Sequence, residues 1–304
     1  MTVRIGVDLG GTKIEIAVLS NSGEVVFRRR LPTPPGYQDK LDAVHALVNS
    51  AETELGIAST PVGLGHPGSL NPRTGLMRNA NTTALNGQPL KHDIETVMGR
   101  PVACANDANC FALSEAFDGA GQHAHSVFGV IIGTGVGGAL VIDKALHSGH
   151  DGNAGEWGHT ALPWPEPDEI PGPQSKCGLY GCVEAWCSGP ALSADHKRQS
   201  GQSLTAHQIS ELAEDGEPHA ITTLDRHSTR LAKSLATVIN IFDPQCIVLG
   251  GGLSNLPNLT QTLANKLPAF VFSDDFTTEI VTNMHGDSSG VRGAAWLNPV
   301  PSPC

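Results

Sequence analysis

Charged and aromatic residues are scarce in this chain of 304 residues, at 16% and 5% of the total. Basic residues are also fewer than acidic ones, 19 against 30, so the formal net charge is −11. Proteins that neutralise nucleic-acid phosphates or anionic lipids over a broad surface carry the opposite balance. The composition therefore argues against nucleic acid and membranes as partners. Any phosphate site should be small and built mainly from backbone N–H groups.

Long apolar runs are missing too. Residues 127–142 carry no charge, but five glycines and a threonine interrupt them, and a membrane helix needs about 20 apolar residues. An alternating apolar segment follows Met1 where a secretory signal would have a basic region. Seven cysteines at irregular spacings fit reduced thiols rather than a disulfide framework. We expect a cytoplasmic protein without membrane spans.

Glycine, in contrast, is abundant, with 35 residues, and 39% of the chain is apolar, which indicates a folded protein of about two domains. The glycines gather in three turns, each directly after an apolar strand: Gly10-Gly11, Gly133 to Gly138 and Gly250 to Gly252. Without Cβ atoms, consecutive backbone N–H groups can point at phosphate oxygens. We predict one nucleotide site from the three turns; the alternative is three tight turns without a ligand.

Strands and helices alternate along the chain, which predicts the α/β class. An antiparallel meander is expected over residues 3–27, further strands at 62–65, 102–105, 130–132, 139–142 and 246–249, and helices at 38–55, 90–98, 220–242 and from 255 onward. The opening pattern of strand, Gly/Thr loop and strand returns 123 residues later, as the distance from Gly10 to Gly133 shows. We interpret this return as an internal duplication.

Two common nucleotide motifs do not explain the glycine turns. The chain has no G-x-x-x-x-G-K-[ST] phosphate loop. Gly133 to Gly138 fit G-x-G-x-x-G, but a β-like segment follows them where the dinucleotide fingerprint needs a helix. Hydride transfer with a nicotinamide cofactor is therefore only a minor alternative.

Six segments together resemble the ROK family of bacterial sugar kinases in composition and order. They are Asp8 to Lys13, Asn106 to Asn109, Gly133 to Gly138, Gly155 to His159, Cys177 to Glu184 and Gly250 to Gly252. The resemblance extends from about residue 3 to residue 297. Residues 79–81, 85–89 and 285–296 are most similar to the fructokinase/mannokinase branch, and the N-acetylglucosamine kinases are the nearest alternative.

This resemblance implies the actin-like ATPase (ribonuclease H-like) fold, in which two related α/β domains enclose a cleft. Residues 1–118 would form the first domain, joined by the C-terminal helix near residues 290–304, and residues 119–289 the second. ATP, Mg²⁺ near Asp8 and Thr12, a small-molecule sugar substrate and a homodimer are implied as well. The residues implied for ATP binding are Asp8, Gly10, Gly11, Thr12, Lys13, Gly133, Thr134, Gly135, Gly137, Gly138, Gly250, Gly251 and Gly252.

Asp107 is the candidate catalytic residue. Phosphoryl transfer to a hydroxyl needs a group that accepts the proton and aims the oxygen at the γ-phosphorus, and a carboxylate at the end of a strand can do both. By itself, the Asn-Asp-Ala-Asn segment at residues 106–109 favours an Asx turn or a helix N-cap. Together with the other family segments, it predicts general-base catalysis by Asp107.

The resemblance also implies a set of sugar-binding residues: Gly68, Asn81, Asn106, Glu156, His159 and Glu184. Gly68 is expected to permit close approach of the backbone to the sugar. Each of the others, taken alone, has an ordinary explanation as a turn amide, a surface carboxylate or a core histidine. His66 is expected to be structural.

The resemblance also implies a structural zinc ion, but one of the usual ligands is missing from this chain. The family usually has a C-x-C-G-x-x-G-C segment and an upstream histidine, but Ser175 stands at the first cysteine position, which leaves His159, Cys177 and Cys182. Three N/S ligands are one short of a closed zinc site, and serine is a poor zinc ligand. Cys187 is an alternative fourth ligand, and packing of this loop without metal is the other alternative.

The leading prediction is ATP-dependent phosphorylation of a hexose primary hydroxyl, foremost O6 of fructose. Kinases of N-acetylglucosamine, mannose or glucose are alternatives within the same family. A sugar-responsive transcriptional regulator is the alternative of another class. Regulators of that type carry an N-terminal helix-turn-helix module, for which a first strand near Val3 leaves no room.

Overall fold

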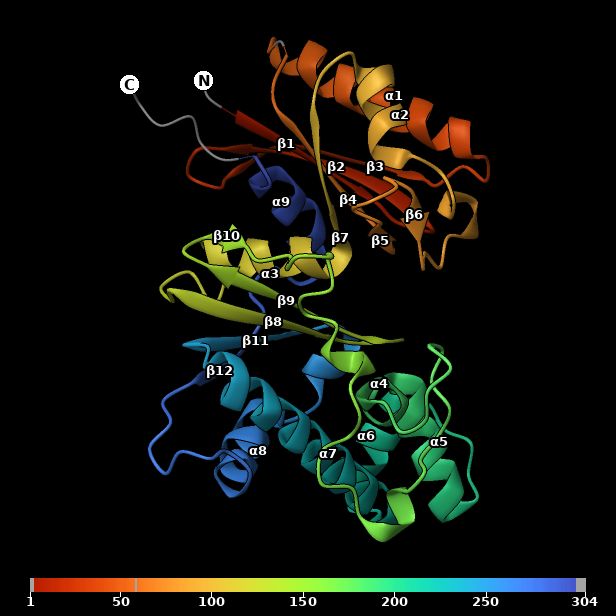
Figure 1. Cartoon of the computed structure of the whole chain (residues 1–304), viewed down its shortest axis with the longest axis vertical. Coiled ribbons are helices and arrows are strands. Elements are labelled where there is room, and N and C mark those ends of the chain that lie inside the picture. The colour runs from red at the N-terminus through yellow and green to blue at the C-terminus, as the bar shows by residue number, and fades with distance from the viewer. Residues whose placement is uncertain (1–2, 58, 299–304) are drawn as a thin grey trace. The chain divides into compact units, whose positions relative to one another are not determined.

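The computed structural model describes residues 3–57 and 59–298 (Figure 1). It divides into two compact units. Unit 1 comprises Met1–Gln122, Lys144–Ala154 and His285–Cys304, and unit 2 comprises His123–Asp143 and Gly155–Met284. The sequence prediction placed residues 119–289 in the second domain, but residues 119–122, 144–154 and 285–289 fall in unit 1. Among the described residues, no helix has the length and apolar character needed to span a membrane.

Unit 1 is built on a five-stranded sheet with the order β3-β2-β1-β4-β7. β1, β2 and β3 form the antiparallel meander expected from the sequence, while β4 and β7 run parallel to β1. The strands are β1 (Val3–Leu9), β2 (Lys13–Ser20), β3 (Val25–Pro32), β4 (Val62–His66) and β7 (Val102–Asn106), and β5 (Ser69–Leu70) pairs with β6 (Met77–Arg78) in a separate hairpin.

The second five-stranded sheet repeats this topology with the order β10-β9-β8-β11-β12. Its strands are β8 (Ser126–Ile132), β9 (Val136–Ile142), β10 (Ala145–Leu146), β11 (Cys246–Gly250) and β12 (Glu279–Thr282). β8 and β9 are antiparallel like β1 and β2, and β11 and β12 run parallel to β8. The turn after β8 therefore corresponds to the turn after β1, which confirms the internal duplication.

Helices cover both faces of the first sheet (Figure 1). α1 buries the apolar positions Leu41, Val44, Leu47 and Val48 against the sheet and ends at Gly56, whose φ is +63°. The helices of unit 1 are α1 (Tyr37–Leu55), α2 (Leu90–Met98), α3 (Asp107–Asp118) and α9 (Ser289–Trp296), with 3-10 turns at Thr83–Leu85 and Gly286–Ser288.

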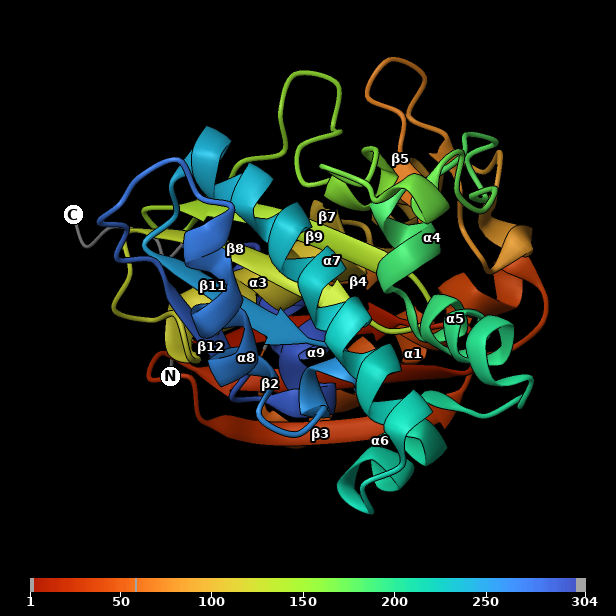
Figure 2. The same cartoon turned by 90° about the horizontal axis from the view of Figure 1, so that it is seen from below.

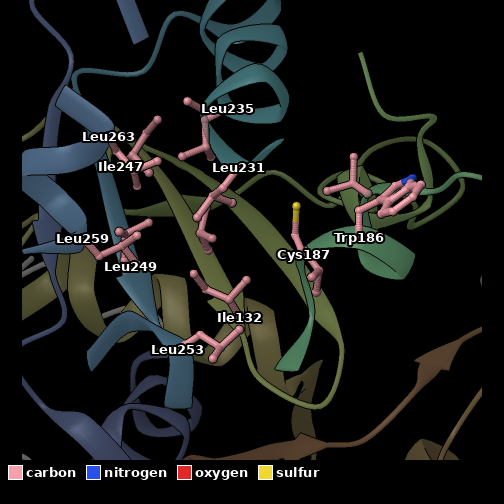
Figure 3. Packing of buried hydrophobic residues seen from close by; sticks show 14 of the residues in the cluster. Ile132, Trp186, Cys187, Leu231, Leu235, Ile247, Leu249, Leu253, Leu259 and Leu263 are labelled. Carbon is pink, nitrogen blue, oxygen red and sulfur yellow. The ribbon is translucent and has the colours of Figure 1, made fainter. Parts of the chain in front are cut away.

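The helices of unit 2 pack around α7, which lies beside α8 and the sheet (Figure 2). Leu231 and Leu235 of α7 meet Ile247 and Leu249 of β11 in the buried core (Figure 3). The helices are α4 (Val183–Cys187), α5 (Gly189–Ser200), α6 (Ala206–Glu214), α7 (Pro218–Phe242) and α8 (Leu259–Lys266), with 3-10 turns at Trp157–His159, Pro167–Glu169, Gly252–Asn255 and Leu267–Ala269.

Candidate active site

The first glycine turn joins β1 to β2 in unit 1. Thr33 holds it at two points: its Oγ1 donates a hydrogen bond to the Gly10 carbonyl at 2.7 Å, and its N–H donates to the Thr12 carbonyl at 2.9 Å. A Cβ atom at Gly11 would lie 3.0 Å from Oγ1 of Thr82. The turn therefore borders the segment that contains Asn81, and the predicted phosphate loop and one predicted sugar residue lie near each other.

Two carboxylates belong to one edge of the first sheet. β1, β4 and β7 run parallel, so their carboxyl ends lie at the same edge, where α/β proteins bind ligands. Asp8 lies at this end of β1, and Asp107 directly follows β7. Burial, followed by repulsion from Asp107 and Glu15, raises the pKa of Asp8 to about 6. The charge of Asp107 therefore acts on Asp8.

Asp107 begins helix α3 but does not cap it. The N-cap is Asn106, whose Oδ1 accepts a hydrogen bond from the N–H of Asn109 at 2.7 Å. Oδ1 of Asp107 accepts from the N–H of Ala108 at 2.8 Å. Solvent reaches the Asp107 side chain, and desolvation still raises its pKa. Asn106, and not Asp107, therefore caps α3. The side-chain NH₂ of Asn106 can still donate a hydrogen bond to a ligand.

Gly68 makes room for the protein's own backbone. Its φ is +72°, and a Cβ atom there would lie 2.5 Å from the Arg78 carbonyl oxygen and 2.6 Å from the Ala80 nitrogen. Asn86 fixes the same segment, because its side chain accepts from the N–H of Ala80 at 2.9 Å and donates to the Ala80 carbonyl at 3.0 Å. The close approach expected between Gly68 and a sugar is therefore made by residues 78–80, which precede the exposed Asn81.

Unit 2 contains a cavity of about 480 Å³ in which the second and third glycine turns meet. A Cβ atom at Gly133 would lie 4.0 Å from the Gly252 nitrogen, and a Cβ atom at Gly252 would meet no other atom within 4 Å. Gly252 therefore borders open space. The lining residues are Gly133, Thr134, Gly189, Pro190, Ala206, His207, Ser210, Gly252, Leu253, Asn255 and Leu256.

Glu184 explains why residue 135 is a glycine. A Cβ atom at Gly135 would lie 2.7 Å from Oε2 of Glu184. The same oxygen accepts a hydrogen bond from the N–H of Val136 at 3.1 Å. The second glycine turn thus fixes the orientation of a predicted sugar-binding carboxylate, and the missing side chain of Gly135 leaves space for it.

Other predicted ATP-binding glycines of unit 2 also pack against the chain. A Cβ atom at Gly138 would lie 2.7 Å from the indole ring of Trp157. At Gly251, where φ is +82°, it would lie 2.5 Å from the Ile132 carbonyl oxygen. The predicted ATP residues outside the cavity lining in this unit are Gly135, Gly137, Gly138, Gly250 and Gly251.

His159, Cys177 and Cys182 form a cluster suited to a metal ion. Their ligand atoms all lie within 4.8 Å of one another, and the two Sγ atoms are 3.6 Å apart. A tetrahedral zinc ion with Zn–S bonds of about 2.3 Å would separate two sulfurs by about 3.8 Å. The cluster therefore fits three corners of a zinc site. Glu156, the one predicted sugar-binding residue not yet described, is exposed and precedes the 3-10 turn that contains His159.

The fourth corner of this cluster faces a serine rather than a cysteine. Ser175 is buried. The neighbouring Leu179 N–H and then the Ser175 hydroxyl lower the pKa of Cys177 to about 7. Cys187, the alternative ligand, lies in the hydrophobic core instead (Figure 3). The residues present thus offer three good zinc ligands and one hydroxyl.

Comparison with known proteins assigns the family. The sequence pattern of the ROK family matches residues 4–300. This chain belongs to the ROK family. An N-acetyl-D-glucosamine kinase of Haemophilus influenzae is 39% identical to it over 301 residues, which cover 96% of this chain and 98% of that protein. A second one, from Photobacterium profundum, is 40% identical over 299 residues, covering 96% and 98%.

Solved structures of ROK proteins have the same fold. A ROK hexokinase from Thermus thermophilus matches with a TM-score of 0.88 and 31% identity, covering 97% of each chain. A ROK family glucokinase from Streptomyces griseus, solved with glucose and AMPPNP, matches with a TM-score of 0.76 and 29% identity, covering 96% of this ROK chain and 98% of the glucokinase. These matches confirm the family and the actin-like ATPase fold predicted from the sequence.

The sequence did not predict the helical wall of the cavity in unit 2. Ser188 caps α5, since its Oγ accepts from the N–H of Ala191 at 3.4 Å, and this helix start is a readable signal directly before Gly189 and Pro190. The sequence does not show which glycine turn the start of α5 contacts. In the structure the Gly189 N–H donates a hydrogen bond to the Gly133 carbonyl at 2.7 Å. α6 also starts with a readable signal, a capping box formed by Thr205 and Gln208, but that signal does not show that α6 lines the cavity.

Proposed function

We propose that this ROK protein is an ATP-dependent sugar kinase whose substrate is N-acetylglucosamine. The observation that carries the activity is Asp107, a solvent-accessible carboxylate of raised pKa at the carboxyl edge of the first sheet, with the capping of α3 left to Asn106. Relatives at 38–40% identity are named as N-acetylglucosamine kinases and support that sugar. The sequence motifs had favoured fructose, which stays the second candidate.

In this proposal the hydroxyl oxygen of the sugar attacks the γ-phosphorus of ATP, Asp107 accepts the hydroxyl proton, and the bond between the γ-phosphorus and the departing ADP breaks. Burial raises the pKa of Asp107, and a carboxylate of raised pKa is a better base than an ordinary aspartate. The turn from Gly10 to Thr12 presents backbone N–H groups to the phosphates. Asp8 would hold the magnesium ion of the nucleotide, which neutralises charge on the transferred group when it is bound.

We assign the adenosine part of ATP to the cavity of unit 2. Its volume lies within the range of small-molecule sites, about 300–1,000 Å³. Leu253, Leu256 and Pro190 offer apolar surface to the base, and Asn255 and Ser210 offer polar groups. This assignment is the same for N-acetylglucosamine and for fructose, because the cavity would bind the nucleotide and not the sugar.

A sugar panel tests the substrate. Phosphorylation of N-acetylglucosamine, fructose, mannose and glucose would be followed with ATP in a coupled assay. We expect the highest kcat/KM for N-acetylglucosamine. A higher value for fructose would overturn this substrate while leaving the kinase mechanism intact, and no activity on any of these sugars would overturn the function.

Asp107→Asn tests the mechanism. We expect kcat to fall at least about 100-fold, the loss typical of a missing general base, with little change in Tm. Asp39→Asn is the matched control, because Asp39 also lies in the first turn of a helix, α1, but outside the proposed site. Near-normal turnover of Asp107→Asn would remove Asp107 from catalysis.

We also propose that His159, Cys177 and Cys182 hold a structural zinc ion with the Ser175 hydroxyl at the open corner. Protein purified without chelator should contain about one zinc per chain, and a strong chelator should remove it more easily than from Ser175→Cys, which has a fourth thiolate. Less than about 0.2 zinc per chain in both proteins would show that this loop packs without metal.

A further inference from the structure

Helix α9 lies against the Asp8 carboxylate in unit 1. A Cβ atom at Gly290, the second residue of α9, would lie 3.3 Å from Oδ2 of Asp8 and 3.6 Å from its Cγ. A contact of 3.3 Å is closer than ordinary carbon–oxygen packing, so a side chain at residue 290 would push on this carboxylate. The missing side chain of Gly290 therefore defines the space in which Asp8 sits.

α9 has little freedom to move away from Asp8. On one side it rests on the sheet, because a Cβ atom at Gly6 would lie only 2.1 Å from the Val291 carbonyl oxygen. On the other side it touches α3, because a Cβ atom at Gly293 would lie 1.7 Å from the Cys110 carbonyl oxygen. Backbone thus meets backbone on both sides of α9, and packing this close transmits displacement instead of absorbing it.

Glu115 of α3 fastens the first turn of α9. Its carboxylate is completely buried and accepts hydrogen bonds from Oγ of Ser289 at 2.9 Å, from the N–H of His285 at 3.2 Å and from the N–H of Ala120 at 3.0 Å. A buried carboxylate is tolerated only when donors compensate for lost water, so these bonds are strongly maintained. Glu115 thereby ties α9 to the helix that begins with Asp107.

We propose that Ser289 and Gly290 are positioning residues for the reaction. The Glu115–Ser289 bond fixes the first turn of α9, and Gly290 at that place allows the Asp8 carboxylate one orientation relative to Asp107. Neither residue contacts substrate in this proposal; both act through Asp8. The inference rests on the proposed kinase function, because it needs Asp8 and Asp107 to act on the same phosphoryl transfer.

Gly290→Ala is the direct test. Alanine favours a helix over glycine, so Tm should stay the same or rise. The added Cβ atom turns the Asp8 carboxylate, so kcat should fall about tenfold while KM for the sugar changes less than about twofold. A role in folding alone would lower Tm and leave kcat per folded molecule unchanged, which is the opposite pattern.

Ser289 provides the second arm. Ser289→Ala should lower kcat about threefold to fivefold, and Ser289→Thr, which keeps the hydroxyl, should restore it. Ser114→Ala is the matched control, because Ser114 is a buried serine on α3 directly before Glu115 and its hydroxyl has no hydrogen-bond partner among the described residues. Its kcat should equal that of the unmodified protein.

The outcomes separate the inference from the function. If the unmodified protein phosphorylates a sugar and Asp107→Asn does not, but Gly290→Ala keeps full kcat, the positioning role is wrong and the kinase assignment stands. If the unmodified protein phosphorylates no sugar, both are wrong. If kcat fell equally in Ser289→Ala and Ser289→Thr, the hydrogen bond between the Ser289 hydroxyl and Glu115 would not position Asp8.

Discussion

His66 ends strand β4 with an imidazole that is only 1% exposed. Burial lowers its pKa to about 4, whereas a histidine in an unfolded chain titrates near 6.5. The unfolded chain therefore binds more protons between these two values, so the free energy of unfolding falls as the pH drops through this window. The burial of His66 fits the structural role expected from the sequence, and we predict that this residue makes the folded state sensitive to acid.

Substituting His66→Gln should reduce this acid sensitivity. The two pKa values give a loss of about 2 kcal/mol from this one group between about pH 7 and pH 5. Urea unfolding at both pH values should show a smaller loss for the variant than for the unmodified protein by about that amount. His150→Gln, at an exposed histidine of unit 1, should change nothing. If the free energy of unfolding fell equally in His66→Gln and the unmodified protein, protonation of His66 would not destabilise the folded state.

At the residue scale, the sequence could name Asn106 and Asp107 but could not divide their tasks. Asparagine and aspartate are almost equally good at a helix N-cap, so the segment leaves open which of them caps α3. The observed helix begins at Asp107, one residue earlier than an Asp107 cap would require. A single residue of register thus decides which side chain is free to act as a base.

At the scale of elements, two glycines of unit 2 should respond differently to the same substitution. Gly252 borders open space in the cavity, so Gly252→Val should leave Tm unchanged and raise KM for ATP about tenfold by filling the adenosine site. Gly135 adjoins Glu184, so Gly135→Val should displace that carboxylate and raise KM for the sugar more than KM for ATP.

Each of these variants is the control for the other. Steady-state kinetics with one substrate varied and the other saturating would separate the two effects, and thermal unfolding would report on stability. If Gly135→Val raised only KM for ATP, the second glycine turn would contact phosphates directly and Glu184 would not bind the sugar. If Gly252→Val left KM for ATP unchanged, adenosine would bind outside this cavity.

The sequence predicted where the glycine turns lie but not what each glycine accommodates. Strand and helix patterns are local, and α2 has the predicted bounds, Leu90–Met98. The neighbour of a glycine is instead supplied by distant segments: Val291 of α9 packs on Gly6 from 285 residues further along the chain, and Glu184 lies next to Gly135. A sequence shows which residues lack a Cβ atom. It does not show which distant part of the chain occupies the space that a side chain would have filled.

At the scale of the whole molecule, two related sheets each present a glycine turn after their first strand. The sequence predicted this duplication because the turns repeat. It did not predict that residues 144–154 belong to unit 1, in which Arg78 lies 3.3 Å from Asn153 and Arg73 lies 3.6 Å from Asp151. Such pairs leave no periodic signal in a chain.

The net charge of −11 predicts how the whole protein should respond to salt. ATP is also strongly anionic, so long-range repulsion should weaken its binding at low ionic strength, and salt screens this repulsion. Lys13 follows the first glycine turn, and its ammonium lies 3.8 Å from the buried carboxylate of Glu15, which also pairs with Arg28 and Arg30. We expect backbone N–H groups, which carry no net charge, to supply most of the phosphate contacts.

We therefore expect KM for ATP to stay constant or to fall between about 50 and about 300 mM KCl, at saturating magnesium. A site formed by lysine and arginine side chains would show the opposite trend, because salt screens attraction as it screens repulsion. KM for the uncharged sugar, measured over the same range, controls for general effects of salt on the enzyme. A rise of several fold in KM for ATP alone would mean that Lys13 or other cations dominate phosphate binding. The glycine turns would then serve mainly to pack the chain, as Gly135 and Gly138 do.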